Sequence, residues 1–218
     1  MSFRLLPLVL SLALGACAPL PDVRERWHEV LEAFAEADAA APPQPGGVLF
    51  VGSSSVRRWE GLPEALPGLA LVNRGVDGVE LAEVSLHARD LVGPYAPRLI
   101  VVYAGDNDLA QGRSPEAVLA AYRAFVAEVH ALQPDTPIVF VAIKPSLARL
   151  PLLGAIQTAN ELIAAYSGEQ EALTFLDVFS PMLGADGLPR RELFVADGLH
   201  LSAAGYALWL ELLRGLLE

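Results

Sequence analysis

The sequence predicts an α/β fold in which helices cover both faces of a parallel sheet, a three-layer α/β/α sandwich. Two observations predict it. Short, nearly continuous apolar runs alternate with longer segments of helical periodicity, as expected for strands that are buried on both faces. Polar segments that contain glycine follow several of these runs, at the edge where open parallel sheets bind ligands. The five expected strands are 48–51, 69–72, 99–103, 138–143 and 173–176.

Helices are expected before, between and after these strands. Ahead of the first strand, Val23, Trp27 and Phe34 recur at helical spacing, and Asp22 is positioned to cap their helix. The later helical segments are 79–91, 115–132, 152–167 and 203–217. The segment 115–132 has the clearest start, with Ser114 as the cap and proline at the first helical position.

The first residues have the layout of an export signal. Arg4 precedes an apolar stretch over 5–14, and small residues precede Cys17, the only cysteine in the chain. The sequence Leu-Gly-Ala-Cys at 14–17 resembles a bacterial lipobox. We therefore expect a lipoprotein signal peptide over 1–16, lipidation of Cys17, and a tether with an N-terminal helix over 17–47. The alternative is an ordinary cleavable signal with a chance cysteine.

The composition limits the partners of the protein. The chain has 218 residues and a formal net charge of −11, and Lys144 is its only lysine. Nucleic acids and anionic lipid surfaces attract clustered Lys and Arg, so we expect neither as an electrostatic partner. After the expected signal peptide, about 200 residues remain, which suits one domain. We expect the protein in the cell envelope, held at a membrane by its lipidated cysteine.

An Asp-x-x-His segment precedes the last helix. The spacing of Asp197 and His200 lets the carboxylate bind one ring nitrogen and leaves the other free to accept a proton from a hydroxyl. Three serines, 53–55, follow the first apolar run and offer that hydroxyl. The alternative is a helix-capping Asp beside a surface His. We expect the other three histidines, which lie in helical segments, to be structural or solvated; they are His28, His87 and His130.

Donors for an oxyanion are available at the same sheet edge. Gly75 or Gly78 could supply a backbone N–H, and Asn107 a side-chain amide. Alternatively, the glycines serve a turn and the asparagine an Asx-turn. Asp106 and Asp108 are a weak candidate for a cation site, and no other group has metal-ligand spacing. We therefore expect an acyl-transfer site that requires no metal and no cofactor.

Other catalytic motifs are missing from the glycine-containing segments. There is no G-x-G-x-x-G and no phosphate-binding loop with its lysine. Val56 stands where the nucleophile elbow G-x-S-x-G would have its second glycine.

Four short blocks, in order, resemble those of the SGNH hydrolases, also called GDSL esterases. They are FVGSSSV, NRGVDG, GDND and DGLH, and the resemblance extends from about Val48 to the C-terminus. GSSSVRRW with YAGDNDLA further resembles a bacterial subgroup of this family. The resemblance implies a hydrolase domain over 48–218 with a flavodoxin-like, five-stranded parallel sheet.

The resemblance also assigns roles to residues. It implies Ser54 as nucleophile, Asp197 and His200 as its triad partners, and an oxyanion hole formed by Ser54, Gly78 and Asn107. Ser53 departs from the pattern, because the family usually has aspartate there. We expect Ser53 and Ser55 to cap the short helix that carries Arg57, Arg58 and Trp59.

The expected function is hydrolysis of short-chain, acetyl-type esters of small molecules, glycans or lipids. The alternatives are lysophospholipase-like or thioesterase-like activity on longer acyl chains, and a non-catalytic lipoprotein that binds an envelope glycan. A metal-dependent phosphoesterase using Asp106 and Asp108 is a further alternative. Arg57 or Arg74 could meet an anionic group of the substrate or pair with a nearby carboxylate. The apolar segment 143–155 could line an acyl pocket or cap the next helix.

Overall fold

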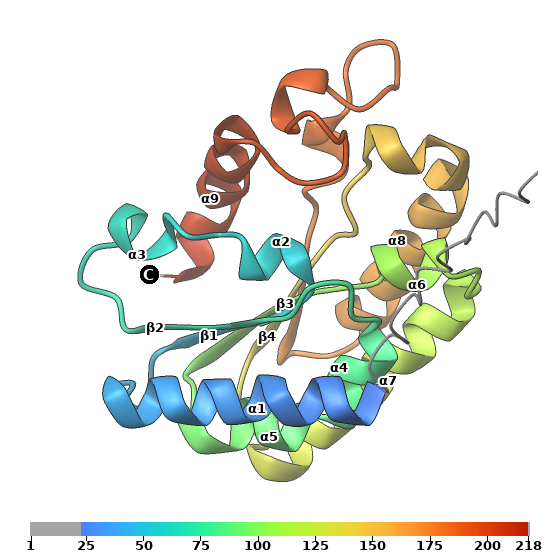
Figure 1. Cartoon of the computed structure of the whole chain (residues 1–218). Coiled ribbons are helices and arrows are strands. Elements are labelled where there is room, and N and C mark those ends of the chain that lie inside the picture. Colours follow the sequence, from blue (N-terminus) through green and yellow to red (C-terminus); the bar gives the residue numbers. More distant parts are fainter. Residues whose placement is uncertain (1–22, 218) are drawn as a thin grey trace, which may run out of the picture.

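The computed structural model describes residues 23–217 (Figure 1). The expected signal peptide, the expected lipidation site Cys17 and the expected cap Asp22 lie outside the described residues.

A five-stranded parallel sheet forms the middle layer, in the order β2-β1-β3-β4-β5. The strands at the centre are buried along their whole length, which explains why their sequences are continuously apolar. The two edge strands are only partly buried. Their bounds are β1 Val48–Gly52, β2 Leu71–Gly75, β3 Leu99–Tyr103, β4 Ile138–Val141 and β5 Leu173–Leu176.

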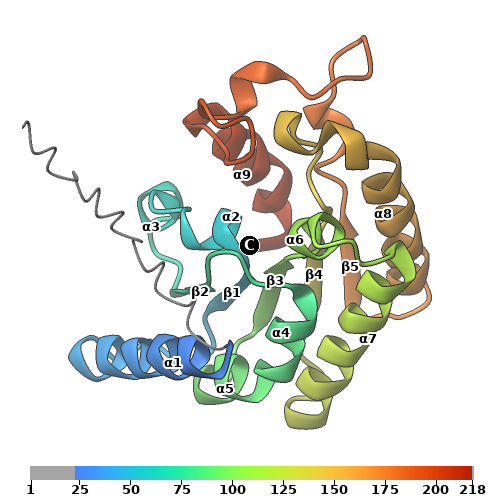
Figure 2. The ribbon, with the colours of Figure 1, turned by 45° about the vertical axis from the view of Figure 1, so that its right-hand side comes forward.

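Helices cover both faces of the sheet, as Figures 1 and 2 show. Connections between parallel strands are right-handed, so the connection from β1 to β2 and the connections that run in the opposite direction, from β2 to β3, β4 and β5, place their helices on opposite faces. One face carries α1 (Val23–Ala40), α4 (Leu81–Leu86), α5 (Ala88–Val92), α7 (Pro115–Leu132) and α8 (Leu153–Gly168). The other carries α2 (Ser54–Arg57), α3 (Leu62–Ala65) and α9 (Ala203–Leu217), while α6 (Asp106–Ala110) lies at the carboxyl ends of the strands.

Several predicted elements are confirmed with their bounds. The strands at Leu99–Tyr103 and Leu173–Leu176 and the helices at Pro115–Leu132 and Ala203–Leu217 begin and end where the sequence predicts. Ser114 caps α7, because its hydroxyl accepts a hydrogen bond from the backbone N–H of Ala117 at 3.3 Å. The predicted three-layer α/β/α architecture is therefore correct.

Other bounds differ from the prediction. β2 starts two residues later than predicted and includes Asn73 and Arg74, whose polar side chains find partners in the fold. β4 ends at Val141 rather than at residue 143. The predicted helix over 79–91 is broken at His87 into α4 and α5. The four remaining short elements are 3-10 turns: η1 (Gly93–Tyr95), η2 (Leu147–Leu152), η3 (Ser180–Met182) and η4 (Arg191–Leu193).

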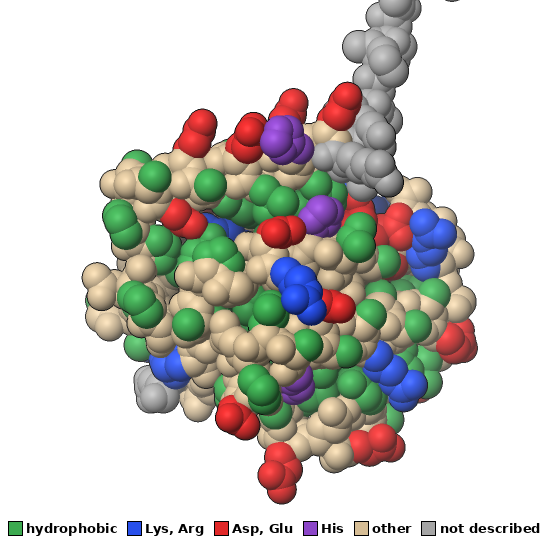
Figure 3. All heavy atoms as spheres, turned by 90° about the horizontal axis from the view of Figure 1, so that it is seen from below, with side chains coloured by type: hydrophobic (Ala, Val, Ile, Leu, Met, Phe, Trp, Pro, Cys, Tyr) green, Lys and Arg blue, Asp and Glu red, His purple; other side chains and the backbone are tan. Residues whose placement is uncertain are grey.

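The surface of the helical face that carries α1 is shown in Figure 3. Acidic side chains form a row along one edge of this view, and cationic side chains are few and separated. This distribution agrees with the acidic composition and offers no basic patch on that face. Within residues 23–217, no helix combines the length and apolarity that crossing a membrane requires.

Candidate active site

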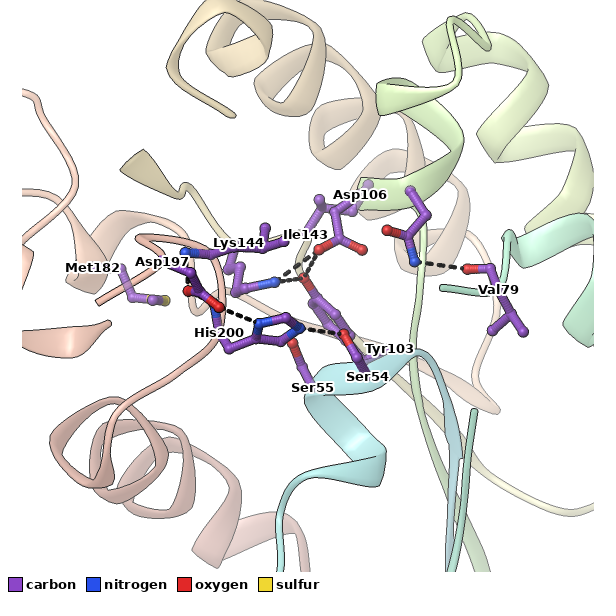
Figure 4. Close-up of polar contacts among 12 residues, drawn as sticks. Ser54, Ser55, Val79, Tyr103, Asp106, Ile143, Lys144, Met182, Asp197 and His200 are labelled. Atoms are coloured by element: carbon purple, nitrogen blue, oxygen red, sulfur yellow. Dashed lines mark hydrogen bonds and ion pairs between the residues drawn. The ribbon is translucent and has the colours of Figure 1, made fainter. Parts of the chain in front are cut away.

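The side chains of Asp197, His200 and Ser54 form a continuous chain of hydrogen bonds (Figure 4). His200 Nδ1 lies 2.6 Å from Asp197 Oδ2, and His200 Nε2 lies 3.1 Å from Ser54 Oγ. The carboxylate can only accept a hydrogen bond, so it fixes the tautomer with the proton on Nδ1. Nε2 is then free to accept the serine proton, as the sequence predicts for an Asp-x-x-His segment.

The loop before α9 holds the carboxylate and the imidazole in place. Asp197 Oδ1 accepts the backbone N–H groups of Leu199 at 2.8 Å and of His200 at 3.0 Å. The Val195 N–H closes the loop on the carbonyl of His200 at 2.9 Å. The hydrogen bond from His200, together with these N–H groups, holds the pKa of Asp197 well below its usual range. The carboxylate therefore stays ionised wherever the site could work.

The turn between β1 and α2 requires glycine at position 52. Gly52 has φ +137°, and a Cβ there would lie 1.8 Å from the carbonyl oxygen of Tyr103 on β3. The next N–H, that of Ser53, donates to this same carbonyl at 2.9 Å. The close approach of the two strands places Ser54 at the first position of α2, where its own N–H has no acceptor within the helix.

Side chains from β2 and α9 hold the turn that carries Ser54. The Asn73 amide donates to the carbonyl of Val56 at 2.7 Å and accepts the Gly75 N–H at 2.9 Å. The Tyr206 hydroxyl donates to the carbonyl of Ser55 at 3.0 Å. Because the carbonyls of Ser55 and Val56 are bound from outside the helix, α2 keeps its position although it is a single turn long.

Two further N–H donors lie at the same edge of the sheet. Gly78 has φ +71°, and its N–H donates to no protein acceptor among the described residues. The Asn107 amide donates one hydrogen to the carbonyl of Val79 at 3.0 Å and keeps a second one. Gly75, the alternative to Gly78 as an oxyanion donor, is not available for that role because its N–H already donates to the Asn73 side chain.

Ser53 and Ser55 were expected to cap α2, and the prediction is wrong for their side chains. Ser53 is the N-cap residue of α2, and its carbonyl accepts the first helical N–H groups. Its hydroxyl makes no capping hydrogen bond, and both serines are fully buried. The helix is held instead by the contacts of Asn73 and Tyr206.

Both arginines that could meet an anionic substrate are paired. Arg57 forms an ion pair with Asp77 at 2.5 Å, which links α2 to the loop that carries Gly78. This partner raises the pKa of Arg57, and Arg57 lowers the pKa of Asp77. Arg74 is buried against α1, where it pairs with Asp38. The structure therefore favours the pairing alternative for each of them.

Asp106 and Asp108 do not share a cation site, because each binds a different protein donor. Asp106 Oδ2 accepts from Lys144 Nζ at 2.8 Å. Both oxygens of Asp108 accept the Leu81 N–H, at 3.0 and 2.9 Å. Over residues 23–217, no group of three or more His, Cys, Asp or Glu side chains could hold a metal ion.

Sequence reasoning missed the buried neighbours of this site. Lys144 and Tyr103 lie beside Asp106, behind the line from His200 to Ser54 in Figure 4. A signal was present: the only lysine of the chain directly follows a buried apolar strand segment. Asp197, His200, Ser54, Gly78 and Asn107, by contrast, all lie at the predicted edge of the sheet.

The other histidines are not in the site. His28 is exposed beside Glu32 on α1, and His87 stacks on Trp27 with ring centroids 4.2 Å apart. His130 Nε2 lies 3.2 Å from the carbonyl of Thr136.

A cavity of about 460 Å³ lies between the segment 58–65, which follows α2 and includes the end of α3, and the first half of α9. Its walls are mainly apolar and include Trp59, Tyr206 and Leu210. Val195 and Leu201, which belong to the loop that holds His200, form another wall. The cavity therefore borders the active-site loop. Within the segment 143–155, the other candidate for lining an acyl pocket, residues 147–152 form a 3-10 turn that leads into α8, in agreement with its alternative role at the start of that helix.

Comparison with known proteins identifies the family. The model of the GDSL-like lipase/acylhydrolase family matches residues 44–208, three quarters of the chain. No curated protein matches the chain at a significant level.

Solved structures share its fold. A Streptococcus pneumoniae protein described as a platelet activating factor has a TM-score of 0.77 at 23% identity, and the match covers 89% of this chain and 96% of that one. A GDSL-like lipase from Bacteroides thetaiotaomicron has a TM-score of 0.74 at 20% identity, covering 86% and 96%. An acetylxylan esterase from Geobacillus stearothermophilus has a TM-score of 0.63 at 16% identity, and the match covers 78% of this chain and 94% of that one. With its parallel five-stranded sheet, the chain belongs to the GDSL-like lipase/acylhydrolase family and is a carboxylic ester hydrolase.

Proposed function

We propose that this protein cleaves short-chain, acetyl-type esters through a Ser54–His200–Asp197 triad and an acyl-enzyme. The observation that carries the proposal is the unbroken hydrogen-bond chain from Asp197 to Ser54. It lies beside N–H donors from Ser54, Gly78 and Asn107, at the sheet edge where such folds bind ligands.

Acylation follows from the geometry. Nε2 of His200 takes the Ser54 proton while Oγ attacks the acyl carbon, and the carbonyl π electrons move onto its oxygen. The resulting oxyanion accepts hydrogen bonds from the N–H groups of Ser54 and Gly78 and from the free amide hydrogen of Asn107. When the carbonyl reforms, the C–O bond to the alcohol breaks, and His200 gives its proton to the leaving oxygen.

Deacylation repeats these steps with water as the nucleophile. His200 Nε2 removes a proton from water, which attacks the acyl carbon of the Ser54 ester. Collapse of the second oxyanion breaks the bond to Ser54 Oγ and returns the proton to it. Asp197 stays ionised throughout and stabilises the imidazolium that forms in each half-reaction.

The acetyl-type substrate is supported by two structural neighbours. One is the acetylxylan esterase from Geobacillus stearothermophilus, and the other is a family 3 carbohydrate esterase from Clostridium thermocellum. Both share the fold of this chain, with TM-scores of 0.63 and 0.61. An acetylated glycan is therefore the substrate class we would test first.

A longer acyl chain is the second candidate, as in a lysophospholipase or thioesterase. It is favoured by the apolar cavity of about 460 Å³, which borders the loop that holds His200, although neither Ser54 nor His200 lines it. An acetyl group would leave such a volume unused, whereas drug-sized ligands fill cavities of roughly 300–1,000 Å³.

A series of p-nitrophenyl esters from acetyl to dodecanoyl, together with acetylated xylan, tests both candidates. The purified full chain should hydrolyse at least one of them with chelator present, and Ser54→Ala should lose that activity. The rate profile against acyl length separates an acetyl esterase from an enzyme for longer chains. Activity that persists in Ser54→Ala, or that chelator removes, would contradict the triad.

We also propose that the protein is a lipoprotein of the cell envelope. The support is the order of Arg4, the apolar stretch 5–14 and Cys17, the only cysteine, all outside the described residues. Expression in a bacterial host with labelled palmitate should give a labelled protein in the membrane fraction. Cys17→Ser should lose the label, and a labelled Cys17→Ser protein would rule the proposal out.

A further inference from the structure

The buried surroundings of the proposed oxyanion donor Asn107 contain a feature that the triad does not use. Asn107 lies in the first turn of α6, a helix of only five residues. So short a helix is not stable by itself and must be held by its neighbours. Its N-cap residue, Gly105, has φ +114° and offers no capping side chain. The orientation of Asn107 therefore depends on contacts from outside the helix.

Asp106, the residue before Asn107, makes one of these contacts. Its side chain is 6% exposed, and its Oδ2 accepts from Lys144 Nζ at 2.8 Å and from the Tyr103 hydroxyl at 3.1 Å. Its other oxygen has no partner among the described residues. Burial alone would raise the pKa of Asp106, but the charge of Lys144 holds that pKa below its usual value. The ammonium thus keeps a charged carboxylate in the interior.

Lys144 is itself fixed from behind. Its side chain is 1% exposed, and Nζ also donates to the Tyr103 hydroxyl at 2.8 Å. The backbone just before it is clamped by Asn160 of α8, whose amide binds both the N–H and the carbonyl of Ile143. A rigid connection therefore runs from α8 through Lys144 and Asp106 to Asn107.

We propose that Lys144 is a positioning residue for the oxyanion donor Asn107 and acts through Asp106. Lys144, Asp106 and Tyr103, here called the sheet-edge cluster, lie at the carboxyl ends of β3 and β4, behind the His200–Ser54 pair in Figure 4. The inference rests on the proposed role of Asn107. The cluster does not touch the substrate, because its three side chains are buried.

The competing explanation is that the cluster only stabilises the fold. Removing one partner of a buried ion pair leaves an unpaired charge and destabilises a protein whether or not catalysis is involved. The two explanations differ in what happens to the turnover of correctly folded enzyme. A misplaced donor lowers kcat with little change in KM, since the oxyanion exists only along the reaction path.

The first test is Lys144→Met, alone and combined with Asn107→Ala, on the best p-nitrophenyl ester. Misplacement by about 1 Å can cost on the order of 10²-fold, so we expect kcat to fall about 10–100-fold with KM nearly unchanged. In the Asn107→Ala background, Lys144→Met should lower kcat less than about 2-fold, because the amide that Lys144 positions is no longer present. An equal loss in both backgrounds, or wild-type kcat in Lys144→Met, would overturn the proposal.

Two further variants address folding. Asp106→Asn keeps the shape and the acceptor, and we expect it to show the same dependence on Asn107 with a smaller loss. An apolar cluster, Lys144→Met with Asp106→Leu and Tyr103→Phe, leaves no unpaired group and should unfold near the wild-type urea concentration. We expect its kcat to remain low. Recovery of both stability and kcat in this variant would show that the cluster only stabilises the fold.

Controls separate this inference from the proposed function. Ser54→Ala must abolish activity, and if it does not, the function rather than the cluster is wrong. Arg74→Met breaks another buried ion pair and is the matched control, with wild-type kcat expected. A loss of kcat in Arg74→Met equal to that in Lys144→Met would overturn the specific role of Lys144.

Discussion

Two clusters of this protein each combine a buried cation with an aspartate and a tyrosine, but they join different parts of the fold. The sheet-edge cluster combines Lys144, Asp106 and Tyr103, with Nζ 5.0 Å from the centre of the tyrosine ring. The second, here called the α1 cluster, consists of Arg74, Asp38 and Tyr95. In it the guanidinium lies 4.7 Å from the centre of the tyrosine ring.

What the two clusters connect is different. In the α1 cluster, the Tyr95 hydroxyl accepts from Arg74 Nε at 2.7 Å and donates to Asp38 Oδ2 at 2.6 Å. It thereby holds α1 against β2. Arg74 follows Asn73, which holds the Ser54 turn, but no member of the cluster is next in sequence to a triad residue or a proposed oxyanion donor. In the sheet-edge cluster, Asp106 directly precedes Asn107. The comparison teaches that the element to which an ion pair is attached, rather than its chemistry, decides whether it serves the fold or the reaction.

The largest effect is expected on stability, when the α1 cluster loses its cation. Arg74→Met leaves Asp38 and Tyr95 without their cation and should lower the free energy of unfolding by about 3 kcal/mol, the lower end for such pairs. The lower end applies because the Asp38 side chain is 24% exposed. Urea unfolding measures this loss, and ester hydrolysis below the transition should show unchanged kcat. A folded Arg74→Met protein with reduced kcat would remove the distinction between the clusters.

The loss of kcat in Asn107→Ala is the upper limit of what changes in the sheet-edge cluster can cost, because the cluster acts through Asn107. Loss of one oxyanion donor costs about 10²–10³ in kcat, and KM should change little. Steady-state kinetics on the same ester measures both parameters, and urea unfolding checks that the variant is folded. If Asn107→Ala turns over substrate like the wild type, Asn107 is not a donor and the sheet-edge cluster has nothing to position.

Asp108 extends the comparison because it is a buried carboxylate that forms no ion pair among the described residues. Its side chain is 2% exposed, and burial raises its pKa from 3.8 to about 6. The folded state therefore binds this proton more tightly than the unfolded chain does. Its contribution to stability is present below about pH 4 and is lost as the pH rises towards 6, by at most about 3 kcal/mol.

Asp108→Asn should remove that pH dependence. The amide cannot ionise, and its oxygen can still accept the N–H of Leu81. We expect the difference in Tm between variant and wild type to shift in favour of the variant as the pH rises from about 4 to 7. Thermal unfolding across this range tests it, and a constant difference would show that Asp108 does not titrate there.

The smallest effect is expected at the exposed pair of Arg57 and Asp77. Both side chains are more than 40% exposed, so solvent screens their attraction, and Arg57→Ala should cost less than about 1 kcal/mol. Since this pair joins α2 to the Gly78 loop, we expect kcat to change less than about 3-fold. Measurements at low and high salt should agree for the variant. A loss comparable to that of Asn107→Ala would make Arg57 a further positioning residue.

Much of this fold could be predicted because burial on both faces leaves a simple signal. The strands β3 and β5 and the helix α7 are bounded by clear changes in polarity, and Ser114 marks where α7 starts. The predicted bounds of the edge strand β2 were wrong because Asn73 and Arg74 look like loop residues. Their polar groups are satisfied by distant partners, Val56 and Asp38, which no local pattern reveals.

The candidate site was predictable where its members are close in sequence or follow a strand. Asp197 and His200 are three residues apart, and Ser54 and Asn107 follow the ends of β1 and β3. The sheet-edge cluster was not predictable, because Lys144 and Asp106 are 38 residues apart and the segment around Lys144 resembles an ordinary apolar loop. The direction of the Ser53 hydroxyl, likewise, depends on packing beneath the turn.

The hydrogen bond between Ser54 and His200 joins residues 146 positions apart. Ser54, the proposed nucleophile, is therefore synthesised well before His200, its proposed base. The Tyr206 hydroxyl that holds the nucleophile turn comes later still, from the last helix. In the proposed mechanism, a chain whose domain has not folded therefore carries an inert serine. Ester hydrolysis then begins only when these distant parts of the domain have met, so the activity reports on completed folding.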